Sequence, residues 1–439
     1  MESSSHNIIS RIKDTDKYFI INLLSQEADI LNTDQYQQIQ NGNLNDKNEF
    51  IKKGYLVEPA LEKARFRKKY LEFLDNRDQD EVQLFFVPGY GCNFQCPYCY
   101  QDEYLNEDPA LSDEIIEGFF HYIDKHFYDR NTYITLFGGE PLLNSNRQKK
   151  SIGKLLEECD DRDLDVAIVT NGYFLEEYLP LLDTASIREI QVTLDGVGEY
   201  HDRRRPLKGG GSTFSKIVQG IDAAMEAGHP INLRMVVDKE NLDQLPALAR
   251  FAIDKKWTSN PLFKTQLGRN YELHHCQMNS DKLYTRIGLY EDIYQLIHAH
   301  PEILEFHKPA FSISKFLFEE GNLPDPLFDS CPGTKTEWAF DYSGKIYSCT
   351  ATVGKEGEEL GTFYPDVRLN EERIEEWESR DILAIEKCRT CNLSLVCGGG
   401  CASVAKNQTG KLHSPDCRPV KELLELGIAT YFREELDAD

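Results

Sequence analysis

The sequence predicts an α/β protein whose central part is an incomplete barrel of six strand–helix units. Between residue 81 and about residue 303, short runs rich in β-branched and aromatic residues alternate with amphipathic stretches of helical period. Such alternation builds parallel strands joined by right-handed helical crossovers. Six units instead of eight leave the barrel partly open. We therefore expect three domains, with bounds 1–80, 81–310 and 311–439.

The composition narrows the class of protein further. The chain has 439 residues, 40% hydrophobic and 28% charged, as expected for a soluble globular protein of two or three domains. No apolar run approaches the ~20 residues of a membrane helix, and the first residues do not resemble a signal peptide. We therefore expect a cytoplasmic protein without a membrane partner. A formal net charge of −25 argues against a nucleic-acid partner.

Residues 1–80 are expected to form a small module with a hairpin followed by helices. The expected strands and helices are, in order, 17–24, 28–32, 33–40, 46–53 and 61–74. A hairpin followed by helices resembles the winged-helix-like element with which some peptide-modifying enzymes recognise their substrates. Two roles stay open for the module: an exposed strand that binds a peptide by strand addition, or a packing extension that caps the barrel.

The central part is expected to carry its functional residues directly after its strands. The six strands are expected at 82–87, 133–137, 166–170, 189–194, 232–237 and 263–267, with helices at 113–127, 153–159, 214–227 and 244–256. Active sites of barrels of parallel strands lie at the C-terminal ends of the strands. The residues that follow each strand are therefore the candidate site residues.

Three cysteines follow the first strand in the spacing C-x3-C-x2-C: Cys92, Cys96 and Cys99. Three thiolates on one loop can hold three irons of a cubane iron–sulfur cluster, which leaves the fourth iron without a protein ligand. Open metal positions mark catalytic sites, whereas structural sites are closed. The motif alone leaves two alternatives, a zinc site with a distant fourth ligand or three unrelated buried thiols.

A second set of cysteines occupies the C-terminal third, interleaved with Gly398, Gly399 and Gly400. Its members are Cys331, Cys349, Cys388, Cys391, Cys397, Cys401 and Cys417. Because the chain shows no export signal, its twelve cysteines indicate metal binding in preference to disulfides. Of the two remaining cysteines, Cys159 is expected to be a buried thiol on a helix. Cys276 ends a His-His-Cys triplet that is either a metal ligand set or an incidental cluster.

These motifs together resemble those of the radical S-adenosylmethionine (SAM) enzymes. The first three cysteines, with the aromatic Tyr98 before the third, resemble the signature of that family. Gly138, Gly139 and Glu140 after the second strand resemble its GGE motif, which binds the amino group of SAM. The resemblance implies that the open iron is chelated by SAM. An electron from the cluster then cleaves SAM to methionine and a 5′-deoxyadenosyl radical, which abstracts a hydrogen from the substrate.

The same resemblance implies further contacts to SAM. Asn171, after the third strand, corresponds to a segment beside the ribose. Asp195 opens a stretch after the fourth strand that supplies an arginine to the SAM carboxylate. Arg205 is the first choice for that arginine and Arg203 the second, with a surface salt bridge as the alternative for each. Arg234, inside an apolar run, is expected to pair with a carboxylate of the site or with the substrate.

The seven C-terminal cysteines resemble the SPASM domain, an extension of some radical SAM enzymes that carries two auxiliary [4Fe–4S] clusters. Family correspondence assigns one complete cluster to Cys388, Cys391, Cys397 and Cys417, and an incomplete one to Cys331, Cys349 and Cys401. The fourth ligand of the second set is Cys276, the substrate, or absent. The resemblance thus implies three [4Fe–4S] clusters and SAM as cofactors, and an electron donor such as flavodoxin or ferredoxin.

SPASM enzymes mostly act on peptides or proteins, and two subfamilies are considered. Anaerobic sulfatase maturases carry an Asp base where this chain has Thr350, and an extra cysteine where it has residues 327–330. They also lack a module like residues 1–80. These departures favour a maturase that forms a thioether or carbon–carbon crosslink in a ribosomally made precursor peptide. They leave the catalytic base unassigned, with Glu319 and Glu320 as candidates.

Two alternatives to the peptide maturase stay open. One is an anaerobic sulfatase maturase, which oxidises a Cys or Ser of its substrate to formylglycine. The other, of a different class, is a non-catalytic iron–sulfur electron-transfer protein or a zinc-binding scaffold. An electron carrier has no use for an open iron and an amino-group site, so the first cysteine loop and Gly138-Gly139-Glu140 distinguish the two classes.

Overall fold

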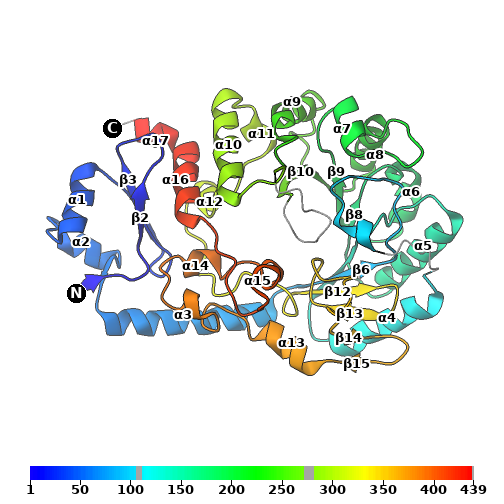
Figure 1. Cartoon of the computed structure of the whole chain (residues 1–439), viewed down its shortest axis with the longest axis horizontal. Helices are drawn as coiled ribbons and strands as arrows, with labels where there is room; N and C mark the ends of the chain where they lie inside the picture. The colour runs from blue at the N-terminus through cyan, green and yellow to red at the C-terminus, as the bar shows by residue number, and fades with distance from the viewer. Residues whose placement is uncertain (105–110, 271–280, 438–439) are drawn as a thin grey trace.

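The computed structural model describes residues 1–104, 111–270 and 281–437 (Figure 1). Its main feature is a ten-stranded sheet with the order β11-β10-β9-β8-β7-β6-β12-β13-β14-β15. Six of these strands are parallel neighbours in the central part of the chain: β6 (Val82–Val87), β7 (Thr132–Leu136), β8 (Val166–Thr170), β9 (Ile187–Thr193), β10 (Ile231–Val237) and β11 (Phe263–Arg269). They lie close to the six expected positions, and the α/β fold class is confirmed.

Helices connect the parallel strands and cover them on the outside. They are α4 (Asp113–His126), α5 (Asn146–Asp160), α6 (Leu175–Leu182), α7 (Glu199–Arg204), α8 (Phe214–Glu226) and α9 (Leu245–Asp254). Strand β6 is buried along nearly its whole length, as its continuous apolar sequence demands of a parallel strand covered on both faces. On α4 the ring of Phe119 packs 4.5 Å from Phe86 of β6 and 5.1 Å from Phe340.

The C-terminal third extends the same sheet, which the sequence analysis did not predict. Strand β12 (Glu337–Asp341) pairs in parallel with β6, and the antiparallel strands β13 (Lys345–Tyr347), β14 (Gly361–Thr362) and β15 (Arg368–Leu369) continue from it. Trp338, Ala339 and Phe340 of β12 are buried. The C-terminal cysteines are therefore built onto the sheet that carries the first cysteine loop.

The remaining helices follow β11 in the chain. They are α10 (Arg286–Ala299), α11 (Ile303–Phe306), α12 (Ser314–Glu320), α13 (Glu371–Glu378), α14 (Ser394–Cys397), α15 (Ala402–Thr409), α16 (Val420–Tyr431) and α17 (Arg433–Asp437). Within the described part of the chain, no helix combines the length and the apolarity that a membrane span requires.

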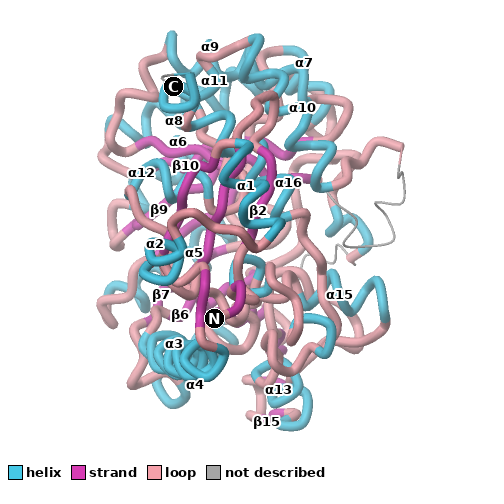
Figure 2. The backbone as a smooth tube through the Cα atoms, turned by 90° about the vertical axis from the view of Figure 1, so that its left-hand side faces the viewer, coloured by secondary structure: helices cyan, strands magenta, loops and turns pink. Residues whose placement is uncertain are grey.

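The N-terminal region contains a three-stranded antiparallel sheet and three helices. Its elements are β2 (Ile8–Arg11), β3 (Tyr18–Asn22), β4 (Glu27–Leu31), α1 (Thr33–Asn41), α2 (Lys47–Lys52) and α3 (Pro59–Gln79), with a short pair formed by β1 (Glu2–Ser3) and β5 (Leu56–Val57). The expected hairpin is β3–β4, whereas β2 was not predicted. Strand β2 packs against α16, as Figures 1 and 2 show.

Helix α3 joins the N-terminal region to the C-terminal third. Figure 1 shows it running beside the segments that carry α13 and α14. The rings of Phe66, Tyr70 and Phe73 lie 5.2, 5.3 and 5.6 Å from the fully buried ring of Phe328. The Tyr70 hydroxyl also donates to Asp381 at 2.7 Å. The N-terminal sheet and α3 thus contact two different parts of the C-terminal third.

Candidate active site and cluster-binding cysteines

The first cysteine loop follows β6 and carries free thiols. Cys96 is buried, and Cys92 and Cys99 are half-buried. Burial raises the pKa of both Cys92 and Cys96 to about 11, although the charge of Arg205 lowers each pKa. Thiolates at these positions therefore need a cation, and a metal cluster supplies one when bound.

The glycine pair after β7 is required by a close approach between two loops. A Cβ on Gly139 would lie 2.3 Å from the backbone oxygens of Tyr90 and Gly91. The amide of Gly139 donates to the Gly89 oxygen at 3.2 Å, and the amide of Glu140 donates to the Gly91 oxygen at 2.8 Å. Any side chain at residue 139 would push the loop away from the cysteines.

Glu140 is buried at the centre of the site and is held by the ends of two strands. Its carboxylate accepts from the Leu142 amide at 2.8 Å, the Thr170 hydroxyl at 2.7 Å and the Asn171 amide at 2.6 Å. Burial raises the pKa of Glu140, and these three bonds oppose the rise. A carboxylate has about four acceptor positions, so an acceptor position remains for a ligand ammonium.

Asn171 links the end of β8 to the cysteine loop. Its side-chain amide donates to the Asn93 side-chain oxygen at 2.7 Å and lies 3.8 Å from the Cys92 sulfur. Because its backbone also binds Glu140, Asn171 contacts both motifs. The structure thus brings together the predicted residues at the ends of β6, β7 and β8.

Tyr98, Asp195 and Arg205 form a second connected group. The Tyr98 hydroxyl donates to Asp195, and Arg205 donates to the Tyr98 oxygen at 2.5 Å. The other Asp195 oxygen accepts from the Val236 amide at 2.9 Å. Asp195 is therefore occupied by groups of this chain.

Arg205 has the properties of an anion-binding residue. Its side chain is buried, and its Nε has no hydrogen-bond partner among the described residues. Its charge also lowers the pKa of the thiol of Cys96. A buried guanidinium with an unused donor is costly unless an anion completes it. This orphaned donor beside the cysteine loop fits a carboxylate-bearing cofactor such as SAM.

The structure does not bring Arg203 to this group. Arg203 is exposed on α7, with its guanidinium 5.7 Å from the Tyr200 ring. Arg204, which the sequence analysis did not select, is buried and forms ion pairs with Asp195 at 3.3 Å and Asp238 at 2.6 Å. Arg204 is thus the cation that stabilises the acidic strand ends.

His201 supports the same strand end as a neutral side chain. Its Nδ1 accepts from the Asp195 amide at 3.1 Å, and the ring is fully buried. Burial, together with the charge of Arg205, lowers the pKa of His201 to about 3. His201 is therefore an uncharged structural acceptor at neutral pH.

The C-terminal cysteines gather in two groups. Burial, together with the charges of Cys397, Cys391 and Cys417, raises the pKa of Cys388 to about 11. Burial, together with the charges of Glu337, Cys331 and Cys401, raises the pKa of Cys349 to about 12. These groups contain the same cysteines as the two sets that the resemblance implies.

The described cysteines are all free thiols. As the side chains stand, no three or more of the described His, Cys, Asp and Glu residues are closed around a single metal ion. A cubane cluster binds each thiolate to a different iron, so the thiols of one cluster need not meet at one point. The donor set, free thiols in three groups, therefore fits iron–sulfur clusters.

Other predicted residues lie away from this site or are differently paired. Cys159 is a buried thiol on α5, as expected. Glu319 and Glu320 are exposed on α12, and Glu319 pairs with two lysines, so neither is a buried base. Arg234 donates to the neutral side chain of Gln191 at 3.2 Å instead of the expected carboxylate. The triplet 274–276, including Cys276, lies outside the described residues.

Sequence reasoning also missed a buried arginine that holds a cysteine loop. Arg380 is fully buried and donates to four backbone oxygens, those of Leu412, Gly399, Gly400 and Ser414, at 2.9 to 3.1 Å. Two of these oxygens belong to the turn between Cys397 and Cys401. Charge-assisted bonds of this kind fix the turn that carries both cysteines. A single arginine has no local pattern that would reveal this role.

Comparison with known proteins identifies the central part of the chain. Residues 86–252 match the family model described as the Radical SAM superfamily, so this part of the chain is a radical SAM domain. Enzymes of this superfamily use a [4Fe–4S] cluster together with SAM. The α/β part of the chain described above therefore contains this domain.

Curated relatives match different lengths of the chain. The GTP 3′,8-cyclase of Nautilia profundicola is 30% identical over 161 residues, which are 35% of this chain and 48% of that protein. The chain thus spans about half the length of such cyclases. The serine-type anaerobic sulfatase-maturating enzyme of Bacteroides thetaiotaomicron is 26% identical over 387 residues, covering 79% of this chain and 87% of that enzyme.

Two solved structures share the fold. The enzyme anSMEcpe with bound AdoMet matches with a TM-score of 0.61 and 16% identity, over 81% of this chain and 100% of that chain. SuiB of Streptococcus suis bound to its precursor peptide SuiA matches with a TM-score of 0.52 and 15% identity, over 95% of this chain and 99% of that chain. At these identities the likeness establishes the fold alone.

Proposed function

We propose that this protein is a radical SAM peptide maturase that abstracts a hydrogen from a side chain or α carbon of a precursor peptide and forms a thioether or carbon–carbon crosslink. Residues 81–310 would form the catalytic domain, residues 1–80 would bind the peptide, and residues 311–439 would carry two auxiliary clusters. The cluster of Cys92, Cys96 and Cys99 would bind SAM and supply the radical chemistry.

The chain's own residues divide the work of holding SAM. Glu140 would accept from the amino group, and Arg205 would donate from its unused Nε to the carboxylate. Asn171 would fix the adjacent ribose while it holds the cysteine loop through Asn93. The observation that carries this assignment is the orphaned, buried donor of Arg205 beside three free thiols.

An open strand edge in the N-terminal region supports a peptide substrate. Strand β4 pairs with β3 on one side, and no described strand pairs with its other side. Ile30 of β4 is 41% exposed. An unpaired edge offers backbone donors and acceptors to an extended peptide, which would add to the sheet as a further strand.

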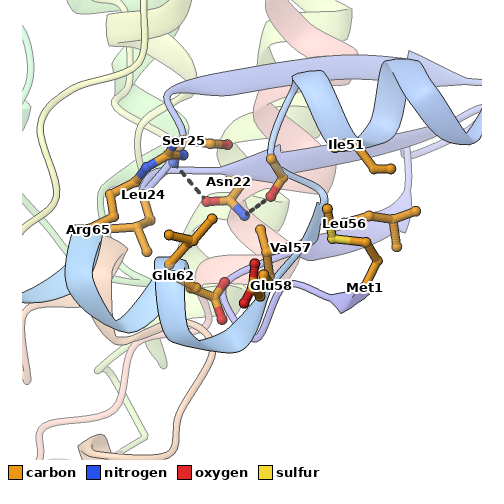
Figure 3. A pocket seen from close by; sticks show the side chains of 12 residues that line it. Met1, Asn22, Leu24, Ser25, Ile51, Leu56, Val57, Glu58, Glu62 and Arg65 are labelled. Atoms are coloured by element: carbon orange, nitrogen blue, oxygen red, sulfur yellow. Dashed lines mark hydrogen bonds between the residues drawn. The ribbon is translucent and has the colours of Figure 1, made fainter.

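A pocket in the same region supplies a place for a peptide side chain. Figure 3 shows it between the end of β3, α2, β5 and α3. Its apolar lining consists of Met1, Leu24, Ile51, Leu56, Val57 and Leu61, and Glu62 and Arg65 flank it. Such a pocket suits an apolar anchor with a polar neighbour.

An anaerobic sulfatase maturase is the second candidate. The sulfatase-maturating relative from Bacteroides thetaiotaomicron, matched over 87% of its length, favours it. Thr350, whose amide binds Glu337 at 3.1 Å, stands where that subfamily carries its Asp base, which favours the peptide maturase. The two candidates differ in their product, so one assay separates them.

The test is an anaerobic assay with reconstituted full-length protein, SAM and a reductant. We expect about twelve irons per chain, formation of 5′-deoxyadenosine, and loss of two hydrogens per crosslink from a short peptide encoded beside the gene. Cys96→Ala should abolish 5′-deoxyadenosine. Conversion of Cys or Ser to formylglycine in a sulfatase peptide, with no change in the precursor peptide, would select the alternative. Absence of SAM cleavage would refute both.

A further inference from the structure

The auxiliary group of Cys331, Cys349 and Cys401 has three cysteines for a cluster with four irons. The structure places Glu337 beside these three cysteines. The sequence analysis had not selected Glu337. The role of this carboxylate rests on the auxiliary cluster of the proposed function.

The register of the β12–β13 hairpin brings Glu337 to Cys349. Ala339 pairs with Tyr347 and Phe340 with Ile346, in antiparallel register. Extrapolated by two residues beyond these pairs, the register would set Glu337 across from Cys349. Residues opposite one another in an antiparallel pair have their Cβ atoms about 4.5–5.5 Å apart. The amide of Thr350, next to Cys349, accordingly donates to Glu337 Oε1 at 3.1 Å.

The loop before β12 brings Glu337 to Cys331 as well. The backbone makes three contacts here. The Glu337 amide donates to the backbone oxygen of Pro332 at 3.0 Å, and the Thr334 amide donates to the backbone oxygen of Glu337 at 2.9 Å. Gly333 and Glu337 also form an isolated β-bridge. The chain thus turns back on itself directly after Cys331.

Cys401 closes the group from the other side. The amide of Ala402, the residue after Cys401, donates a hydrogen bond to Cys331. The Ser403 hydroxyl lies 3.9 Å from the Cys349 sulfur. The three thiols and the carboxylate therefore come from three segments that meet at one place.

The Glu337 carboxylate has no cationic partner in the described structure. Its hydrogen-bond donor is the Thr350 amide, and no described basic side chain forms an ion pair with it. Lys335, two residues away, is instead bound to Asp329 and to the backbone oxygen of Arg380. A largely buried carboxylate without a cation is costly. An iron would supply the missing positive charge.

We propose that Glu337 is the fourth protein ligand of the auxiliary cluster held by Cys331, Cys349 and Cys401, and that a carboxylate oxygen binds the remaining iron. The ligand set is then three thiolates and one carboxylate. Oxygen is a harder ligand than sulfur, so this iron differs from the other three in lability and in its spectroscopic signature.

The test isolates this cluster in the full-length chain. A parent variant replaces the other two sets of ligands with alanine, at Cys92, Cys96, Cys99, Cys388, Cys391, Cys397 and Cys417. Glu337→Ala and Glu337→Cys are then added to it separately. Glu356→Gln, an exposed carboxylate of the same segment, serves as the matched control. Iron content, Mössbauer and electron paramagnetic resonance spectra and the reduction potential are measured after anaerobic reconstitution.

We expect about four irons in the parent and in the Glu356→Gln control. Glu337→Ala should lose one iron and give the signal of an oxidised [3Fe–4S] cluster. Glu337→Cys should keep all four irons, lose the Mössbauer component of the oxygen-bound iron, and show a lower reduction potential because thiolate donates more charge. If Glu337→Ala does not fold, the potential and the Mössbauer spectrum of Glu337→Cys decide the question.

Two outcomes overturn the proposal in different ways. A parent that binds no iron refutes the auxiliary cluster, and with it this part of the proposed function. A parent with four irons whose spectra and potential are unchanged in both Glu337 variants refutes carboxylate ligation alone. Loss of the same iron on Cys276→Ala, with no loss in Glu337→Ala, would assign the fourth position to Cys276.

Discussion

At the scale of single residues, three consecutive arginines at the end of one short helix have three different environments. Arg203 is exposed, Arg204 neutralises Asp195 and Asp238, and Arg205 is buried beside the cysteine loop with an unused donor. Arg203 and Arg204 are successive residues of α7 and point about 100° apart, and Arg205 follows the end of the helix with a non-helical backbone, so the three side chains do not share one site. Substitutions of these arginines can therefore be compared with one another, because the side chain is the same and only its surroundings differ.

We expect Arg205→Gln to weaken binding of SAM to the reconstituted protein at least tenfold, about 1.4 kcal/mol, because it removes the guanidinium charge opposite the carboxylate. Arg203→Gln is the control and should change the affinity less than twofold. Equilibrium dialysis of labelled SAM measures both. Equal effects of the two substitutions would remove Arg205 from the SAM site.

His201 makes the free energy of unfolding depend on pH. Its folded-state pKa is about 3, against 6.5 when unfolded, so the unfolded chain binds the proton between these values and stability falls as the pH falls below 6.5. At pH 5 the loss from this residue is about 2 kcal/mol. We expect His201→Asn to remove that loss in urea unfolding at pH 8 and pH 5. His413→Asn, at an exposed position, should keep the wild-type difference.

The sequence predicted the site residues that belong to short motifs. The cysteine spacings and Gly138-Gly139-Glu140 are short patterns, and their loops come together because they follow adjacent parallel strands. Arg204, Glu337 and Arg380 could not be selected in the same way. Their partners lie at other strand ends or in other loops, and only the folded chain reveals these pairings.

At the scale of elements, the strands with local partners were predicted and those with distant partners were not. The parallel strands β6 to β11 follow one another in the sheet in the same order as in the chain, so each one pairs with the next strand of the sequence. Strand β12 pairs with β6, from which it is separated by about 250 residues, and its five-residue pattern alone specifies no partner. Strand β2 was missed because its four residues alternate weakly and it relies on β3 and α16 for burial.

Helix α3 provides a matched pair of positions to test the pocket of the N-terminal region. Leu61 and Leu71 are both exposed, at 66% and 60%, but only Leu61 lines the pocket. We expect Leu61→Asp to weaken binding of the precursor peptide at least tenfold, because it places a charge in an apolar pocket. Leu71→Asp should have an effect of less than twofold. Fluorescence anisotropy of the labelled peptide measures both affinities.

Loss of peptide binding in both leucine variants would indicate a general effect of charge on α3. No loss in either would move the peptide site to the β4 edge alone. Since both leucines are solvent-exposed, we expect neither substitution to change the free energy of unfolding by more than about 0.5 kcal/mol. Unfolding measurements on the same samples therefore confirm that binding and not folding has changed.

At the scale of the whole molecule, the first 80 residues are integrated with the C-terminal third. Apolar residues of the N-terminal sheet belong to the same continuous core as the barrel, and the Lys13 amide donates to the Glu425 oxygen of α16 at 3.2 Å. Helix α3 docks separately on Phe328. The sequence analysis described a separate module because strands and helices repeat locally there, whereas docking contacts leave no periodic pattern.

Phe328 is the residue through which this integration can be tested. It is fully buried, and three rings of α3 surround it within 5.6 Å. We expect Phe328→Ala to lower the free energy of unfolding by about 3–5 kcal/mol, since it removes a buried ring and leaves a cavity. Phe316→Ala, at a ring that is 43% exposed, should cost less than about 1 kcal/mol. Urea unfolding measures both values.

The same variant shows whether the two contacts of the N-terminal region act together. If α3 holds the region on its own, Phe328→Ala should release residues 1–80 to limited proteolysis while the remainder stays folded. If the contact of β2 with α16 suffices, cleavage should be confined to the α3 segment. An unchanged cleavage pattern together with an unchanged free energy of unfolding would contradict a role for Phe328 in docking. Since Phe328 lies three residues before Cys331, docking of α3 also supports the loop that begins the proposed auxiliary cluster.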